Sequence, residues 1–329
     1  MTPVGIAATA TAFPPSTRPI ADIFADEGVD LPGELAERLG IREVGVGSAG
    51  ADLALAAATD ALAAAGAAGR DVDVIVDYTI LPQEYLVPVW NLGNRLQHEL
   101  GATRAFTLGF SGGGATNFHV ALRAATDLLR AGDGLRTALL FGADVAIPGN
   151  RVVERDEPVT VLGDGASAVV LRAGEEHDVV LGVELASDGA YHDVAHIPGG
   201  ALAQLDHDHD EDLYRLRIDV DRLAAAPTGA TVDRLTGLVL DRAGAGRDDV
   251  AHWVCPNLSA ADQDGYRAAW GAAPAPACAA NLAAHGHVQA NDLVANLRAV
   301  VADGCDGGDL VLLASHGMGF TAGAALVRH

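Results

Sequence analysis

The sequence predicts an α/β fold in which layers of strands and helices pack on one another. Segments with the character of strands alternate with segments of helical character along the 329 residues. Several of the strand-like segments are continuous apolar runs, the pattern expected of strands covered on both faces. Hydrophobic residues make up 50% of the chain, which is enough for a large buried core.

The individual elements follow from these apolar patterns. The predicted strands are 72–78, 104–110, 137–143, 167–172, 179–185, 251–255, 308–314 and 321–327. The predicted helices are 51–66, 88–100, 113–131, 231–243 and 290–303. In the third helix, Phe118, Leu122, Ala125 and Leu129 recur at helical spacing and mark one buried face. The length suggests two units of about 150 residues each.

Composition and charge exclude several classes of function. All 21 basic residues are Arg, and with 44 acidic residues they give a formal net charge of −23. Such a charge repels a phosphate backbone, so we expect no nucleic-acid partner. The sequence contains neither 18 consecutive apolar residues nor a basic leader, so we expect no membrane span or signal peptide. Three cysteines are too few for a disulfide framework, and we expect a cytoplasmic protein.

One acidic segment could be interpreted as a metal site. Residues 206–212 alternate His with Asp before a Glu-Asp pair. Carboxylate-rich runs of this kind usually stay in water, and we interpret the segment as a solvated loop. The sequence therefore predicts no metal site.

The first motif that carries chemistry is Phe110-Ser111-Gly112-Gly113-Gly114, between a predicted strand and a predicted helix. At such a turn, helix N-terminal N–H groups and the helix dipole stabilise negative charge on an oxygen nucleophile or an oxyanion. As a nucleophile, Ser111 would need a base. The alternative is a serine that caps the helix, followed by glycines for close packing.

The second motif is His285-Gly286-His287, followed by Asp292. Asp292 falls in the first turn of the helix predicted over 290–303. From there a carboxylate can hold an imidazole in one tautomer, which a general base requires. The alternative is a histidine in a turn and an acidic residue that simply complements a helix N-terminus.

Three further motifs lie at strand ends. Asn257, in Cys255-Pro256-Asn257, could point its amide into a cleft or belong to a simple turn. The turn Ser315-His316-Gly317-Met318-Gly319-Phe320 could bring a backbone N–H close to a substrate or be a plain hairpin turn. We interpret Gly163-Asp164-Gly165-Ala166-Ser167 as structural, a tight turn with an Asp cap.

Taken together and in order, these motifs resemble the ketoacyl-ACP synthase III branch of the thiolase-fold condensing enzymes. The similarity extends to an opening Val4-Gly5-Ile6 with Phe13-Pro14, to Leu39-Gly40-Ile41-Arg42, to the Gly-Asp-Gly-Ala turn, and to the closing segment from Gly308 to Gly323. The resemblance implies a thiolase-like five-layered αβαβα fold from two pseudo-duplicated halves. The halves would be 1–172, carrying the nucleophile, and 173–329, carrying the His, Asp and Asn. It also implies a homodimer that pairs through strand 104–110.

The chain departs from the family at the catalytic positions. The nucleophile of the family is Cys; here Ser111 occupies that position when read from the following helix, and Gly112 when read from the preceding strand. The helix side matches over more residues and favours Ser111. The catalytic His position holds Asn257, and the catalytic Asn position holds His287. The sequence therefore resembles a Ser–His–Asp variant, similar to natural-product acyltransferases and starter-unit synthases.

The resemblance also assigns substrate-contacting residues. The backbone N–H groups of Ser111 and Met318 would form the oxyanion hole. Tyr85 and Trp90 would face the acyl pocket, where their bulk favours a short acyl chain. Arg42, Arg151 and Arg155 are candidates for a basic mouth that admits the phosphopantetheine arm, although each could be an ordinary surface arginine.

The function expected from these residues is transfer of a short acyl group through an acyl-Ser111 intermediate. The donor would be acyl-CoA or an acyl carrier protein, so the thioester carrier is a substrate and no further cofactor is expected. The acceptor would be a malonyl carrier protein, an amine or a hydroxyl, in polyketide or related biosynthesis. The alternatives are a non-catalytic partner subunit of a thiolase-fold heterodimer and a thioester hydrolase.

Overall fold

The computed structural model describes residues 2–80, 92–147, 149–198, 215–317 and 320–329. In these residues nine strands form one sheet, in the order β13-β14-β15-β10-β1-β9-β6-β4-β5. Their bounds, in that order, are Val250–Val254, Leu310–Gly317, Thr321–Arg328, Val179–Ser187, Val4–Ala12, Gly165–Ala173, Thr137–Asp144, Val74–Asp77 and Phe106–Gly109. Short pairs of strands are β2 (Thr17–Pro19) with β3 (Glu43–Gly45), β7 (Val152–Val153) with β8 (Thr160–Val161), and β11 (Ala195–His196) with β12 (Arg217–Ile218).

The strands fall into two groups that meet at a narrow join. Strands β13, β14, β15 and β10 form one group, and β1, β9, β6, β4 and β5 form the other. At the join, Gly5 of β1 is paired with Val179 of β10. The predicted boundary between 1–172 and 173–329 falls close to this join, between β9 and β10. The division into two halves with separate roles stays a prediction.

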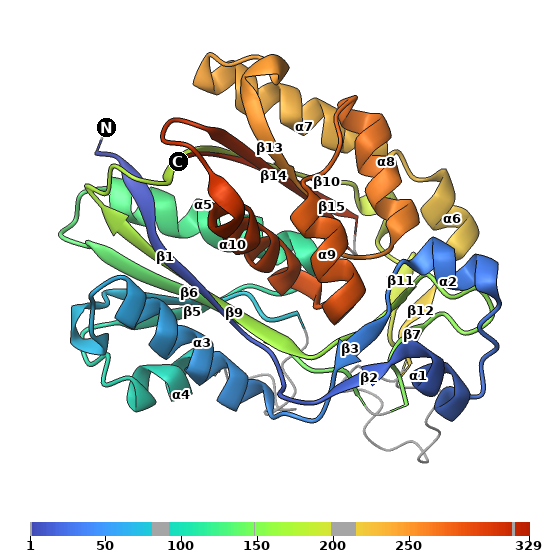
Figure 1. Ribbon diagram of the computed structural model, residues 1–329. Coiled ribbons are helices and arrows are strands. Elements are labelled where there is room, and N and C mark those ends of the chain that lie inside the picture. Colours follow the sequence, from blue (N-terminus) through green and yellow to red (C-terminus); the bar gives the residue numbers. More distant parts are fainter. Residues whose placement is uncertain (1, 81–91, 148, 199–214, 318–319) are drawn as a thin grey trace.

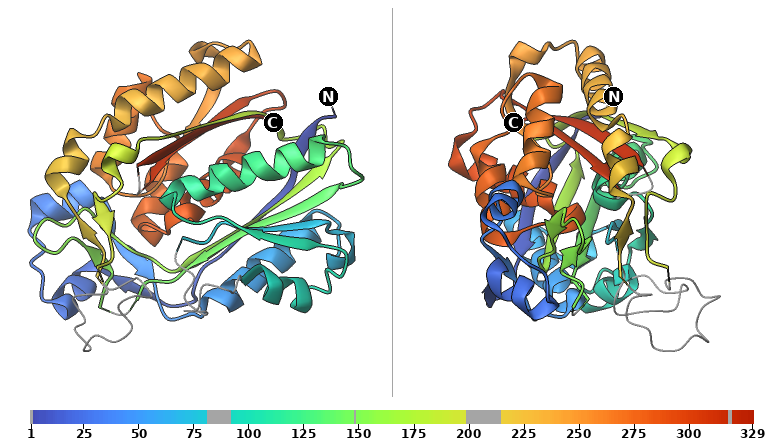
Figure 2. Two further views of the ribbon diagram at one scale, coloured as in Figure 1. Left: turned by 180° about the vertical axis from the view of Figure 1, so that it is seen from behind. Right: turned by 90° about the vertical axis from the view of Figure 1, so that its right-hand side faces the viewer.

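Helices complete the layers. Between the two groups of strands lie α5 (Asn117–Arg130) and α10 (Asp292–Gly304), each of which contacts strands of both groups. The outer face of one group is covered by α3 (Gly50–Ala64) and α4 (Leu92–Glu99), and that of the other by α7 (Thr228–Ala243). The predicted five-layered αβαβα fold is confirmed (Figures 1 and 2).

Burial explains why these segments form these elements. The apolar face predicted on the 113–131 helix is buried in α5: Phe118, Leu122 and Ala125 are fully buried and Leu129 nearly so. They belong to a core that also includes side chains of the strands on both sides, from Val4 to Val327. Within the described ranges, no helix is long and apolar enough to cross a membrane.

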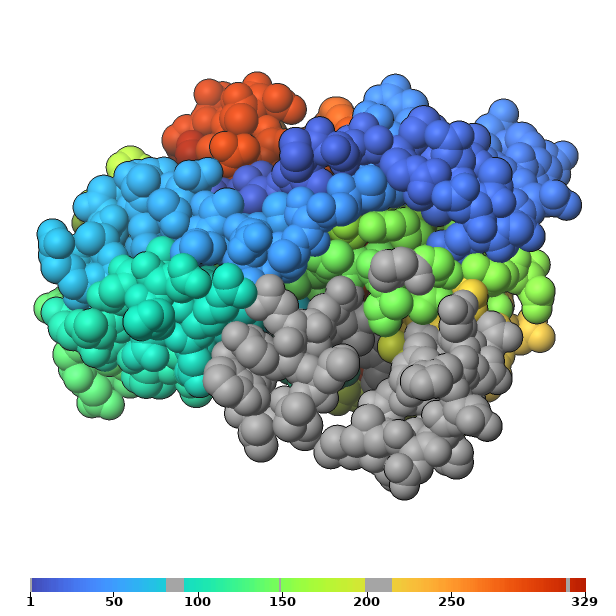
Figure 3. Space-filling view, turned by 90° about the horizontal axis from the view of Figure 1, so that it is seen from below, coloured from blue at the N-terminus to red at the C-terminus, as the bar shows by residue number. Residues whose placement is uncertain are grey.

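Five α-helices of the described residues were not predicted from the sequence: α1 (Ile20–Glu27), α2 (Gly33–Leu39), α6 (Val220–Ala225), α8 (Ala260–Trp270) and α9 (Pro276–His285). The signals for α8 are local. The Ser259 side chain accepts the backbone N–H of Asp262 at 3.1 Å, and Gly271 ends the helix in the left-handed conformation with φ 68°. The short helix α6 precedes α7. Seen from below, α3 and α4 form one side of the molecule and the N-terminal elements the other (Figure 3).

Candidate active site

The turn that carries Ser111 is held at both ends by one buried side chain. Strand β5 ends at Gly109, and the chain turns through Gly112, with φ 89°, into the short helix η2 (Gly114–Thr116) and then α5. Asn117, the first residue of α5, accepts the backbone N–H of Gly113 at 2.9 Å and donates to the Phe110 carbonyl at 3.2 Å. Ser111 itself is exposed. The predicted strand–turn–helix arrangement is thus present, and Asn117 fixes its shape.

The β14–β15 hairpin packs against the same turn. Thr321, at the start of β15, donates its hydroxyl to the Gly113 carbonyl at 2.7 Å. At Gly317, a Cβ atom would lie only 2.0 Å from that carbonyl oxygen, so no other residue fits without a shift of the backbone. The β14–β15 hairpin is therefore part of the support for the nucleophile turn. Met318 lies outside the described residues, and its predicted place in the oxyanion hole stays a prediction.

His287 and Asp292 form a buried pair, as their spacing predicts. The Nδ1 atom of His287 lies 2.6 Å from Oδ2 of Asp292, and the two residues are 7% and 0% exposed. Because a carboxylate only accepts hydrogen bonds, Nδ1 carries the proton and Nε2 is left as the basic nitrogen. Asp292 is itself held by the backbone N–H groups of Val288 at 2.7 Å and Asn257 at 2.8 Å.

The Gly-Asp-Gly-Ala turn positions the loop that contains His287. Leu162 and His287 form a parallel bridge, in which the Gly163 N–H donates to the His287 carbonyl at 3.1 Å. A Cβ at Gly163 would lie 2.1 Å from the His285 carbonyl oxygen, so the turn and the loop touch backbone to backbone. The Asp164 carboxylate accepts the N–H groups of Gly47 and Ala146. The motif therefore has a structural role, but Asp164 connects distant segments and does not cap a tight turn of its own.

The nucleophile turn and the His–Asp pair lie at the same place in the fold. Helix η2, directly after the turn, packs against η7 (Gln289–Asn291), the segment between His287 and Asp292. Residues far apart in the sequence are thus brought together across the two groups of strands. The assignment of Ser111 rather than Gly112 as the nucleophile stays a prediction.

The side chain of Asn257 is engaged inside the protein. It is 1% exposed, and its Oδ1 accepts Asn296 Nδ2 at 2.9 Å and Gln263 Nε2 at 3.4 Å. Its Nδ2 donates to Asn296 Oδ1 at 3.4 Å. Its backbone N–H, as noted, holds Asp292. Asn257 thus holds the carboxylate that contacts His287, and its side-chain amide is bonded within the protein. The predicted catalytic role of Asn257 stays a prediction.

Sequence reasoning missed a second imidazole–carboxylate contact near the first. The hydroxyl of Tyr266 lies 2.8 Å from Nδ1 of His316, and Nε2 of His316 lies 3.6 Å from Asp262. Burial raises the pKa of Asp262, while His316 and His287 nearby partly oppose that rise. Asp262 thus lies within electrostatic range of both imidazoles. The sequence offered His316 only as part of a glycine-rich turn, because its partners lie on α8.

The three arginines predicted at the mouth lie in different surroundings. Arg42 is exposed, and its backbone is tied to the carbonyl of Ala283 in α9. Arg151 is largely buried and donates two bonds to Asp164, at 2.8 and 2.9 Å. To bind a phosphate it would have to release that carboxylate. Arg155 contacts Glu27 at 3.3 Å. The substrate roles of all three stay predictions, as do those of Tyr85 and Trp90, which lie outside the described residues.

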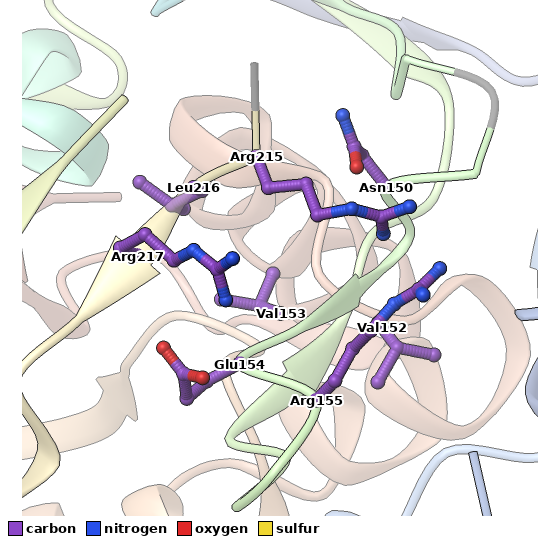
Figure 4. Close-up of a pocket in the computed structure, with 8 residues that line it drawn as sticks. All are labelled: Asn150, Val152, Val153, Glu154, Arg155, Arg215, Leu216 and Arg217. Atoms are coloured by element: carbon purple, nitrogen blue, oxygen red, sulfur yellow. The ribbon is translucent and has the colours of Figure 1, made fainter. Parts of the chain in front are cut away.

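Arg155 also lines a pocket between β7 and β12 (Figure 4). The lining residues are Asn150, Val152, Val153, Glu154, Arg155, Arg215, Leu216 and Arg217. The guanidinium groups of Arg155 and Arg215 lie on the same side of the pocket and both donate to the Gly149 carbonyl, at 3.1 and 2.8 Å. Since β7 pairs with β8, and Leu162 directly after β8 bridges His287, the strand pair beside this pocket also contacts the loop of His287.

Comparison with known proteins gives a consistent result. Residues 113–189 match the family model described as 3-oxoacyl-[acyl-carrier-protein (ACP)] synthase III, and residues 240–329 match the model of its C-terminal part. The chain is 31% identical over 312 residues to the beta-ketoacyl-[acyl-carrier-protein] synthase III of Rhodospirillum centenum, covering 89% of each chain. It is 33% identical over 291 residues to that of Rhodospirillum rubrum, covering 84% of this chain and 83% of the other.

A solved structure gives the same fold. The 3-oxoacyl-(acyl carrier protein) synthase III of Pseudomonas aeruginosa superposes with a TM-score of 0.82. The two chains are 24% identical, and the match covers 99% of this chain and 98% of the other.

Proposed function

The chain belongs to the beta-ketoacyl-[acyl-carrier-protein] synthase III family of condensing enzymes, and from that premise we propose that it transfers a short acyl group through an ester on Ser111. The observation that carries the proposal is the buried 2.6 Å contact between His287 and Asp292, next to the turn that holds Ser111. We propose a thioester of CoA or of a carrier protein as the donor. The setting would be polyketide or related biosynthesis, and the enzyme a cytoplasmic homodimer.

The geometry supports a two-step reaction. In the first step Ser111 Oγ attacks the thioester carbon while His287 Nε2 takes the hydroxyl proton; the C–S bond breaks and the thiol leaves with that proton. In the second step His287 takes the proton of the acceptor, which attacks the ester carbon. The bond between that carbon and Ser111 Oγ then breaks, and His287 returns the proton to Ser111 Oγ. The backbone N–H of Ser111, with that of Met318, would stabilise the oxyanion in both steps.

The position of Asn257 favours plain transfer over decarboxylative condensation. Condensation requires donors aimed at a thioester enolate, and the amide of Asn257 is occupied by Asn296 and Gln263. A hydroxyl or amine acceptor needs only the base and the oxyanion hole. We therefore propose an oxygen or nitrogen acceptor as the preferred substrate of the second step. Release of carbon dioxide from malonyl carrier protein, at the rate of acyl transfer, would contradict this preference.

We propose that the pocket in Figure 4 is the entrance for the donor. CoA and phosphopantetheine are anionic, and the chain carries a net charge of −23, so a local group of cations is needed to bind them. Arg155, Arg215 and Arg217 outnumber Glu154, the acidic residue in the lining of this pocket, and Arg155 is in addition paired with Glu27. This arrangement supports catalysis by the isolated chain over the role of a non-catalytic partner subunit.

Intact-mass measurement tests the proposal. The protein is incubated with short acyl-CoAs and acylated carrier proteins, and an adduct of one acyl group is expected in the wild type and absent in Ser111→Ala. Ser16→Ala is the matched control, because Ser16 is also exposed but lies directly before β2. An adduct that survives in Ser111→Ala, or none with any donor, would overturn the assignment. Free acid formed without any acceptor would instead support a thioester hydrolase.

A further inference from the structure

Three side chains with metal-ligand chemistry meet at one corner of the fold. His252 lies in β13, Cys305 directly follows α10, and Asp309 directly precedes β14. The Nε2 atom of His252 lies 3.4 Å from Asp309 Oδ2, and the Sγ atom of Cys305 lies 3.9 Å from the same oxygen. All three ligand atoms lie within 4.8 Å of one another, and each residue is partly exposed. We propose that His252, Cys305 and Asp309 form a binding site for a divalent transition-metal ion, with Zn²⁺ the best match.

The distances suit a tetrahedral site. Bonds of about 2.0–2.1 Å to nitrogen or oxygen and about 2.3 Å to sulfur place neighbouring tetrahedral ligand atoms about 3.4–3.6 Å apart. The distance of 3.4 Å between His252 and Asp309 fits as it stands. The Cys305 sulfur lies 3.9 Å from Asp309 and within 4.8 Å of the His252 nitrogen, so a change of rotamer must bring it closer to both. Imidazole, thiolate and carboxylate are the ligands that Zn²⁺ uses. The partial exposure of the three residues leaves the fourth position to water.

The electrostatic surroundings favour a cation. Asp309 and Asp178 lie close enough to the Cys305 thiol for their negative charges to act on it. Asp306 adds a further negative charge. Cys305 also follows the C-terminal end of α10, where the helix dipole is negative. When a metal ion binds, the Cys305 thiol releases its proton to solvent and a metal–sulfur bond forms. The charge of the cation then offsets the negative charges of the nearby carboxylates.

The corner is separate from the active site. Helix α10 begins at Asp292 and ends at Gly304, and with a rise of about 1.5 Å per residue its ends are about 18 Å apart. The chain end also lies at this corner, because the His329 N–H donates to the Asp309 carbonyl at 2.9 Å. A bound ion would therefore link β13, the end of α10 and the start of β14, and stabilise the closing strands.

Cobalt provides the direct test. Full-length protein freed of metal by a chelator is titrated with Co²⁺ under reducing, oxygen-free conditions. One equivalent is expected to give the thiolate-to-cobalt absorption in the near ultraviolet, and Zn²⁺ should remove it. Cys305→Ser should abolish this band, whereas Asp306→Asn, a neighbouring carboxylate outside the ligand set, should keep it. A band that persists in Cys305→Ser comes from the buried thiols Cys255 and Cys278, and would overturn the proposal.

A second measurement starts from the wild type and does not need Cys305→Ser. Zn²⁺ should protect Cys305 of the wild type from alkylation by iodoacetamide, read by peptide mass spectrometry. In His252→Ala the Zn²⁺ concentration needed for protection should rise by at least about tenfold. Equal alkylation with and without Zn²⁺ would contradict the site. Acylation of Ser111 should proceed with or without chelator, so this test and that of the proposed function fail independently.

Discussion

At the scale of single residues, the Asp292 carboxylate connects three parts of the site through its hydrogen bonds. One buried carboxylate orients the His287 imidazole and accepts the backbone N–H groups of Val288 and Asn257. It thereby ties the loop of the base to the end of β13. Its spacing from His287 was predictable from sequence because both lie in one short segment. Its contact with Asn257 was not, because the two are 35 residues apart.

Asp292→Asn should leave the chain folded but slow acyl transfer by a factor of about 10³–10⁴, because an amide no longer enforces the tautomer with Nε2 free. Single-turnover acylation of Ser111, followed by mass, measures the rate. Asp193→Asn is the control, since Asp193 is exposed and pairs with Arg222. A normal rate in Asp292→Asn would refute the role of the pair.

His119 should make stability depend on pH. It is fully buried against Ser315, and burial lowers its pKa to about 4. The unfolded chain, with a pKa of about 6.5, binds a proton that the folded chain excludes. The stabilisation that comes from keeping His119 neutral is therefore complete above about pH 6.5. Between pH 6.5 and 4 the free energy of unfolding falls by about 3 kcal/mol. Urea unfolding of the wild type and of His119→Asn measures it; equal pH slopes in the two would contradict the assignment.

At the scale of elements, eight of the nine strands of the large sheet were predictable from their apolar runs, whereas β1, the short strand pairs and the short helices were not. Strands such as β4 and β6 are buried along their whole length, so their apolar runs are unambiguous. Helices α8 and α9 are only partly buried and depend on caps and on neighbouring helices. Parts of the site also depend on contacts between distant residues. Thr321 donates to the Gly113 carbonyl from 208 residues away, and no local sequence pattern predicts that contact.

Gly317→Ala should disturb the nucleophile turn through the hairpin that supports it. The new methyl group would meet the Gly113 carbonyl at 2.0 Å, so the turn or the hairpin must move. A displacement of about 1 Å at a reacting group can cost about 10²-fold in rate. The rate of Ser111 acylation should fall by that order while the circular dichroism spectrum is retained. Gly307→Ala, with open space around it, is the matched control and should have the wild-type rate.

At the scale of the whole molecule, the edge strand β5 leaves one edge of the large sheet open to pairing with a second chain. Strand β5 ends the strand order, and Phe106 is 43% exposed on it. An uncovered edge strand with an apolar side chain is a template for a second chain. This placement agrees with the dimer that the sequence led us to expect through 104–110, which stays a prediction.

Phe106→Asp should convert a dimer of the wild type into a monomer, because two buried carboxylates would face each other across a twofold axis. Light scattering after size exclusion measures the mass. Leu238→Asp, a change at a residue 39% exposed on α7, should remain dimeric. A wild type that elutes as a monomer, or a dimer that survives Phe106→Asp, would refute pairing through β5.

The narrow join between Gly5 and Val179 has a consequence for evolution and for engineering. Ser111 lies shortly before α5 and His287 shortly before α10, and these two helices pack between the groups of strands. A change of side-chain volume on α5 or α10 would therefore slide the nucleophile relative to its base without touching either. Substitutions far from any reacting atom can therefore change the reaction rate, and directed evolution should find such mutations in α5 and α10.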